Sequence, residues 1–202
     1  RQFGVHSAMP SITAKRLCPN IIFLPVDMNK YRSVSKEIHN IFKCYTKIIE
    51  PVSLDEAYLD VTSSHYCEGN ANEMAHQIRN KIFNDLKITA SAGIASNKFL
   101  AKLASEWRKP NGQFSITDEM TKEFIRKLPI RKIIGVGEKT EKKLRNIGIE
   151  TCQDLQKKSV DELTMVFGKF GISLYDLCRG IDKRDVEHDK NSKSLSVEDT
   201  YL

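Results

Sequence analysis

The stretch Ser53-Leu54-Asp55-Glu56-Ala57-Tyr58-Leu59-Asp60 decides the fold around it, because it joins a strand pattern to two adjacent carboxylates. From Ala57 to Val61, apolar and polar residues alternate, which is the period of a strand with one buried face. Upstream, residues 46–52 are also strand-like, and Pro51 indicates that regular pairing stops there. The sequence therefore predicts a β-hairpin with residues 53–56 near its turn.

Asp55 and Glu56 are the candidate metal ligands of this hairpin. Neighbouring side chains of a regular strand point to opposite faces, so a turn or bulge is needed for both carboxylates to reach one ion. Adjacent carboxylates repel unless a cation or proton lies between them, and Mg²⁺ typically binds one or two protein carboxylates plus substrate phosphates. The pair alone is also compatible with a solvated acidic turn, since charged residues are common at the surface.

Two further segments carry recognisable patterns. Arg1 to Pro10 reads R-Q-F-G-V-H-S-A-M-P, and Thr89 to Lys109 contains A-S-A-G-I-A and K-F-L-A-K-L-A-S before Pro110-Asn111-Gly112. Together with S-L-D-E-A-Y-L-D, these segments resemble the Y-family, or translesion, DNA polymerases, most closely the DinB branch called DNA polymerase IV. The resemblance runs nearly from end to end of the chain, with the segments in the family's order.

The resemblance implies roles for individual residues. Asp55 and Glu56 match two acidic ligands of the palm, which would hold two Mg²⁺ ions during deoxynucleotidyl transfer. Arg1 and Lys109 match basic residues that contact the incoming deoxynucleoside triphosphate, and Ser53 belongs to the same motif as the carboxylates. The implied reaction is template-directed DNA synthesis on primer–template DNA, in translesion synthesis and DNA repair.

The family's pattern extends beyond this chain at both ends. A further metal-binding Asp, and the aromatic residue that excludes ribonucleotides, belong to a strand and helix several dozen residues before the segment that starts here at Arg1. At the other end, Ser194 to Glu198 resembles the entry to the little-finger domain. We therefore expect an internal fragment that is catalytically incomplete by itself, with any sliding-clamp contact in regions outside it.

The rest of the sequence predicts an α+β fold: part of a polymerase palm and fingers, followed by an all-helical thumb. Apolar residues recur at helical spacing over 30–45 and 70–87, which predicts two amphipathic helices covering an antiparallel sheet, with a further short strand over 89–94. The expected domains are part of the fingers (1–28), part of the palm (29–117), a thumb (118–182), and a linker with the start of the little finger (183–202).

Short helices follow one another beyond residue 118. Thr151 with Asp154, and Ser159 with Glu162, place a hydroxyl three residues before an acid, as in a capping box. The polar stretch from Asp182 to Ser194 predicts a linker.

The formal net charge of +6 is concentrated in one part of this helical region. Between Thr121 and Lys158 there are 11 Lys and Arg against 5 Asp and Glu, while the rest of the chain has 21 of each. Two short apolar-faced helices are expected to flank the Gly135-Val136-Gly137 turn, as in a helix-hairpin-helix that binds DNA through its backbone. The candidate DNA-binding residues are Gly135, Gly137, Lys139, Lys142 and Lys143. The same pattern also fits a glycine-capped turn with a solvated basic face.

Composition excludes several classes of protein. With 202 residues, 40% hydrophobic and 29% charged, the chain is an ordinary globular protein of one or two domains. It has no apolar run of eighteen residues, which excludes a membrane span. Five scattered cysteines argue against a disulfide framework and for a reducing compartment. With the resemblance, this predicts a bacterial, nucleoid-associated cytoplasmic protein, a monomer by default.

One alternative from another functional class stays open. In it, the chain is a non-catalytic helix-hairpin-helix module, the basic region binds duplex DNA, and the carboxylates are structural. Asp55 and Glu56 buried apart from each other would favour this alternative, whereas an open position facing Lys109 would favour catalysis.

Overall fold

The computed structural model of the chain describes residues 2–188. The chain forms two compact units, Arg1–Ser33 and Val34–Leu202. The smaller unit contains α1 (Ser11–Leu17) and the start of α2 (Met28–Lys43). Arg1 lies outside the described residues, and every other candidate site residue belongs to the larger unit.

The predicted hairpin is confirmed. Strands β1 (Ile48–Pro51) and β2 (Ala57–Asp60) pair antiparallel, with Glu50 opposite Tyr58. The main chain closes the turn beyond the last pair, where the N–H of Val52 donates to the carbonyl of Glu56 at 2.9 Å. Residues 53–56 therefore form the turn, outside the regular strands, as the sequence predicts.

A second pair of strands corrects the expectation of a wholly antiparallel sheet. Strand β3 (Ala92–Ala95) pairs in parallel with β4 (Gln113–Ile116), and helix α4 (Lys98–Trp107) connects them. Parallel neighbours require a crossover, and α4 provides it. The sequence predicted a strand over 89–94 but not β4, because four residues after Gly112 are too few to show a clear period.

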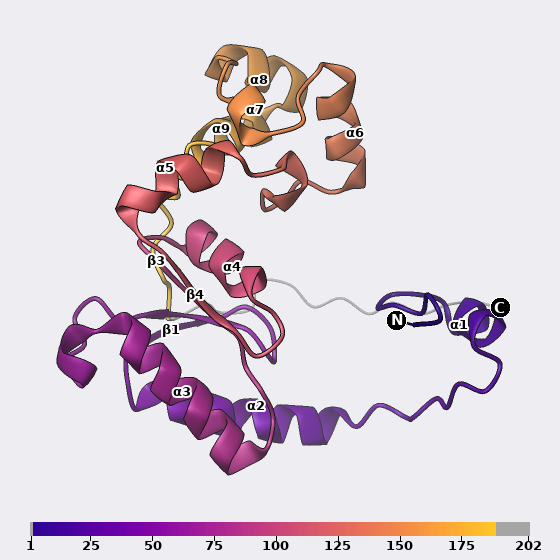
Figure 1. Ribbon diagram of the computed structural model, residues 1–202, viewed down its shortest axis with the longest axis vertical. Helices are drawn as coiled ribbons and strands as arrows, with labels where there is room; N and C mark the ends of the chain where they lie inside the picture. Colours follow the sequence, from indigo (N-terminus) through magenta and orange to yellow (C-terminus); the bar gives the residue numbers. More distant parts are fainter. Residues whose placement is uncertain (1, 189–202) are drawn as a thin grey trace. The chain divides into compact units, whose positions relative to one another are not determined.

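Helix α4 packs closely on β3. A Cβ added to Gly93 would lie 2.1 Å from the carbonyl oxygen of Ala101, so only glycine fits at this position. Helix α3 (Ala71–Leu86) lies on the other side of the strands (Figure 1). The two helices thus enclose the short strands, and α4 is a covering helix additional to the two expected from the sequence.

The two predicted amphipathic helices are confirmed as α2 and α3. Their stripes supply the buried side chains Ile41, Ile78 and Ile82, which pack with partly buried neighbours including Leu59 of β2. Each fully buried aliphatic side chain contributes about 1.5–3 kcal/mol. This core holds the hairpin against the helices.

The helical region begins after β4 and has a continuous core that reaches back to α4. Phe99 and Leu100 of α4 pack in one buried cluster with Leu144, Leu163 and Leu174. Both predicted capping boxes are present, at Thr151/Asp154 and Ser159/Glu162. The remaining elements are η1 (Tyr66–Gly69), α5 (Asp118–Arg126), η2 (Ile130–Lys132), α6 (Glu138–Asn146), α7 (Cys152–Leu155), α8 (Val160–Phe167) and α9 (Lys169–Leu177).

The first helix expected before the Gly-Val-Gly turn is only the single 3₁₀ turn η2. Its start is fixed by an isolated β-bridge between Pro129 and Thr151, and the N–H of Ile130 donates to the carbonyl of Glu150 at 3.0 Å. These bonds use backbone groups that a longer helix would need for itself. Among residues 2–188, no helix is long and apolar enough to cross a membrane.

Candidate active site

The turn of the hairpin presents both predicted carboxylates to solvent. Asp55 is exposed, and the Glu56 side chain is 37% exposed. The hydroxyl of Ser53 donates to Asp55 Oδ1 at 2.6 Å, which fixes one carboxylate within the turn. Neither carboxylate is buried, so the pair does not lie apart in a core, and the open position expected of a catalytic pair and that of a solvated acidic turn are the same here.

Lys102 of α4 forms an ion pair with Glu56, the second carboxylate of the turn. Lys102 Nζ lies 2.6 Å from Glu56 Oε1 and 3.9 Å from Glu106 Oε1. Lys109, the predicted triphosphate contact, is 47% exposed and pairs with the same Glu106. The carboxylate turn and Lys109 are therefore joined by a run of alternating charges, Glu56, Lys102, Glu106 and Lys109.

Lys102 and Glu106 were not singled out from the sequence. Their signal is spacing, because Lys98, Lys102 and Glu106 recur every four residues and so share one face of α4. The pattern looks like an ordinary solvated helix face until the partner on the hairpin, 46 residues earlier than Lys102, is known.

Beneath this exposed run lies a buried ion pair. Lys98 Nζ is 2.5 Å from Glu50 Oε2, and the two side chains are only 7% and 5% exposed. Lys98 Nζ also donates to the carbonyl of Asp185 at 3.0 Å, and Glu50 Oε2 accepts from the N–H of Glu187 at 3.0 Å. The pair fastens β1 to α4, and so fixes the position of the turn that follows β1.

Asp182 attaches the segment after α9 to the start of α4. Its carboxylate accepts from the N–H of Phe99 at 3.1 Å and from Nε and Nη2 of Arg184 at 2.7 and 2.8 Å. Burial acts to raise the pKa of Asp182, but the hydrogen bonds and the charge of Arg184 outweigh it and leave the pKa lowered. Residues 182–188 of the predicted linker are thus attached to the strand region, while the rest of that linker lies outside the described residues.

Asp55 and Glu56 provide oxygen ligands of the kind that Mg²⁺ prefers. Over residues 2–188 the structure records a partner for one oxygen of each carboxylate, which leaves the second oxygens for other ligands. The same residues contain no group of three or more His, Cys, Asp or Glu side chains placed to hold a metal. In its chemistry, this donor set matches an ion that takes two protein carboxylates and completes its coordination with water and substrate phosphates.

The basic turn places its candidate DNA-binding residues on the surface. Gly135 has φ +87°, a left-handed value that favours glycine, and Gly137 precedes the first turn of α6. A Cβ on Gly137 would meet nothing within 4 Å, so this backbone can be approached closely. Lys139, Lys142 and Lys143 are exposed, and Lys142 already pairs with Glu138 at 2.8 Å.

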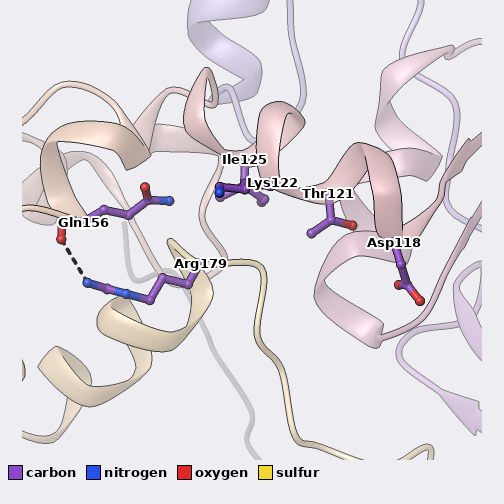
Figure 2. A pocket seen from close by; sticks show the side chains of 6 residues that line it. All are labelled: Asp118, Thr121, Lys122, Ile125, Gln156 and Arg179. Atoms are coloured by element: carbon purple, nitrogen blue, oxygen red, sulfur yellow. Dashed lines mark hydrogen bonds between the residues drawn. The ribbon is translucent and has the colours of Figure 1, made fainter.

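A pocket of about 510 Å³ lies in the helical region, and none of its lining residues belongs to the carboxylate turn (Figure 2). Its Arg179 donates to the carbonyl of Gln156 at 2.9 Å and lies 3.6 Å from the ring centroid of Tyr175. These contacts already use the guanidinium, and Asp118 is the one carboxylate among the lining residues. It is lined by Asp118, Thr121, Lys122, Ile125, Gln156 and Arg179.

Trp107 is a packing residue in this structure. Its ring lies 4.7 Å from that of Phe124 and 6.1 Å from that of Phe114. The cluster joins α4, β4 and α5.

Two parts of the chain match known family profiles. Residues 1–106 match the impB/mucB/samB family, and residues 131–182 match the thumb domain of DNA polymerase-iota. The first match includes both carboxylates of the turn, and the second includes the basic turn.

Curated relatives match over the whole chain. The DNA polymerase IV of Glaesserella parasuis serovar 5 (strain SH0165) is 51% identical over 202 residues, which is 100% of this chain and 57% of the relative. The DNA polymerase IV of Legionella pneumophila (strain Philadelphia 1) is 51% identical over 201 residues, again 100% of this chain and 57% of the relative. The chain therefore spans somewhat more than half the length of these relatives.

Solved structures show the same architecture. DinB from Sulfolobus solfataricus superposes with a TM-score of 0.84 at 33% identity, covering 93% of this chain and 56% of that one. The insertion ternary complex of Dbh DNA polymerase gives a TM-score of 0.86 at 34% identity, covering 93% and 55%.

Proposed function

Since this chain belongs to the impB/mucB/samB family, the Y-family of DNA polymerases, in its DinB or DNA polymerase IV branch, we propose a function in translesion synthesis. In this proposal, the chain carries the nucleotidyl-transfer site and the duplex-binding surface of a translesion polymerase. The reaction is template-directed addition of a deoxynucleotide to a primer 3′ end with release of pyrophosphate. The observation that carries the proposal is the solvent-facing pair Asp55 and Glu56, linked through Lys102 and Glu106 to Lys109.

Each residue has a specific part in this proposal. Asp55 and Glu56 supply carboxylate oxygens to two Mg²⁺ ions, which when bound stabilise the attacking and leaving oxygens of an in-line displacement. Ser53 holds Asp55 within the turn. Lys109 and Arg1 neutralise negative charge on the β and γ phosphates, an electrostatic contribution that lowers the barrier.

The basic turn holds the duplex in this proposal. The backbone around Gly135 and Gly137 approaches a phosphate, and Lys139, Lys142 and Lys143 add attraction without reading bases. Such a grip tolerates any sequence, which suits an enzyme that copies damaged templates. The match of residues 131–182 to a polymerase thumb profile supports this assignment.

The domain boundaries belong to the same proposal. Residues 1–28 are part of the fingers, 29–117 part of the palm, 118–182 the thumb, and 183–202 a linker with the start of the little finger. The protein would act as a monomer in the bacterial cytoplasm, associated with the nucleoid, and a sliding clamp would bind other regions.

A chimaera tests the proposal. In it, this chain replaces the matched 57% of the Glaesserella parasuis relative, and Mg²⁺-dependent primer extension is measured. We expect extension by the unsubstituted chimaera, and a fall of about a hundredfold to a thousandfold for Asp55→Asn or Glu56→Gln. Glu37→Gln on α2, also an exposed acid, is the matched control and should leave the rate unchanged.

The outcomes separate the two classes of function. Equal extension by the double carboxylate variant and the unsubstituted chimaera would refute the metal-ligand assignment. Duplex binding with no extension by the unsubstituted chimaera would favour the non-catalytic DNA-binding module.

A further inference from the structure

Arg79 connects α3 to the loop that carries Lys109. From α3, its guanidinium reaches Asn111, in the loop Lys109-Pro110-Asn111-Gly112, and Gln113 at the start of β4. Nη2 donates to the carbonyl of Asn111 at 2.6 Å and to its side-chain Oδ1 at 2.9 Å. Nε donates to the carbonyl of Ala90 at 2.9 Å, and Nη1 lies 3.5 Å from Gln113 Oε1. All three nitrogens of one side chain are therefore directed at this loop and the strand ends beside it.

The loop that Arg79 holds has little conformational freedom of its own. Asn111 has φ +49°, and a Cβ on Gly112 would lie 1.7 Å from the carbonyl oxygen of Arg108. Gly112 is also bonded toward β3, since its carbonyl accepts from the N–H of Ala92 at 3.0 Å and its N–H donates to Ser91 Oγ at 3.3 Å. From the α3 side, Arg79 holds Asn111 of the loop itself, while Gln113 Nε2 at the start of β4 donates to the carbonyl of Asn72 at 2.8 Å.

We propose that Arg79 is a positioning residue for Lys109. Lys109 is exposed and lies just beyond the end of α4. The position of its backbone therefore depends on how the rest of the loop, from Pro110 to Gly112, is held. A planar guanidinium makes several hydrogen bonds in fixed directions, and a lysine ammonium cannot reproduce them. Arg79 therefore sets where the Lys109 ammonium meets the triphosphate without touching the nucleotide itself. This inference rests on the proposed function of Lys109.

The first experiment measures the loop directly, in the chain itself. Amide hydrogen exchange is compared among the unsubstituted chain, Arg79→Lys, and Lys81→Gln, which changes an exposed cation on the same helix that pairs with Asp85. We expect faster exchange at Gly112 in Arg79→Lys only. Unchanged exchange at Gly112 would overturn the proposal, whether or not Lys109 contacts the triphosphate.

The second experiment is a double-mutant cycle in the chimaera. Arg79→Lys should lower kcat/KM for the incoming nucleotide by about fivefold, an effect typical of residues that act together. In a Lys109→Ala background, the same change should produce no further loss, because Arg79 acts through Lys109. Lys81→Gln should have no effect in either background.

The outcomes of the cycle distinguish the two assignments. An unchanged kcat/KM in Lys109→Ala alone would contradict the proposed role of Lys109. A loss in Lys109→Ala together with an equal, additive loss from Arg79→Lys in both backgrounds would show that Arg79 is merely structural, and would overturn the inference while leaving the proposed function intact.

Discussion

The strand region (residues 48–116) and the helical region (residues 118–177) both contain ion pairs between residues three or four apart, but they differ in their long-range pairs. In the strand region, Lys98 and Lys102 pair with acids on a distant hairpin. In the helical region, most recorded pairs join residues three or four apart in the chain, as Lys142 does with Glu138. The first arrangement fixes tertiary geometry at a few points, whereas the second leaves a diffuse basic surface. We therefore expect single substitutions to have large effects in the first region and small, salt-dependent effects in the second.

The buried pair gives the largest expected effect. Glu50→Gln leaves the Lys98 ammonium buried without its anion, which should lower the free energy of unfolding by about 3–5 kcal/mol. Replacing both residues, as Glu50→Gln with Lys98→Met, should cost less, because no uncompensated charge remains. Urea denaturation measures both variants. Asp85→Asn, which breaks an exposed pair with Lys81, is the control and should leave the denaturation midpoint almost unchanged.

The contribution of Asp182 to stability should depend on pH, which offers a second test of the strand region. Because its pKa is lowered in the folded state, its contribution is complete above the unfolded pKa, near 3.8, and is lost as pH falls through the folded value. Asp182→Asn should cost about 1.5–3 kcal/mol at neutral pH, as expected for hydrogen bonds to a charged group. The stability difference from the unsubstituted chain should shrink in acid. A difference independent of pH would contradict the assignment.

Lysines of the basic turn should behave additively. Fluorescence anisotropy with a DNA duplex gives the slope of log K against log[salt]. This slope is negative, and its magnitude decreases by about 0.9 for each phosphate contact removed. Lys139→Ala and Lys143→Ala should each change the slope by that amount. Lys142→Ala should change it less, because Glu138 already neutralises this cation. Lys127→Ala, in a pair with Glu123 on α5, is the control; a slope change as large as that of Lys139→Ala would argue against a localised grip.

Lys102 gives the smallest expected effect, and its sign is informative. On the proposed metal role of Glu56, Lys102 would compete with the metal for this carboxylate, so Lys102→Met should strengthen Mn²⁺ binding by about twofold to fivefold, the scale of a partly exposed ion pair. Lys102→Arg should restore the original affinity. Titration followed by electron paramagnetic resonance measures the free ion. Weaker binding in Lys102→Met would mean that the lysine orients Glu56 for the metal.

The hairpin, its carboxylate turn and the two covering helices were predictable because their signals are local. Alternation from Ala57 and the stripes of α2 and α3 each extend over several residues, and the hydroxyl–acid spacing at Thr151 and Ser159 identifies a cap directly. The structure confirms these elements, while the roles of the site residues stay predictions.

The features that could not be predicted from the sequence depend on partners far away in the chain. Lys98 looks like a solvated helix residue until Glu50, 48 residues earlier, is placed beside it. Strand β4 is too short for a periodic signal, and its pairing with β3 depends on α4 packing against Gly93. The attachment of residues 182–188 uses the carbonyl of Asp185 and the N–H of Glu187, and backbone groups of this kind have no signature in sequence.

The bond between the N–H of Glu187 and Glu50 Oε2 closes a loop of 137 residues. Apart from Ile41 of α2, the closed loop contains the buried residues of both hydrophobic cores, so neither core can loosen far while the bond and its neighbours hold. Closing so long a loop has a high entropic cost, which grows only slowly with length and so differs little from that of a loop half as long. Because the continuous core also joins α4 to the helical region, the larger unit should unfold in a single cooperative transition, and removing residues 182–188 should lower its stability.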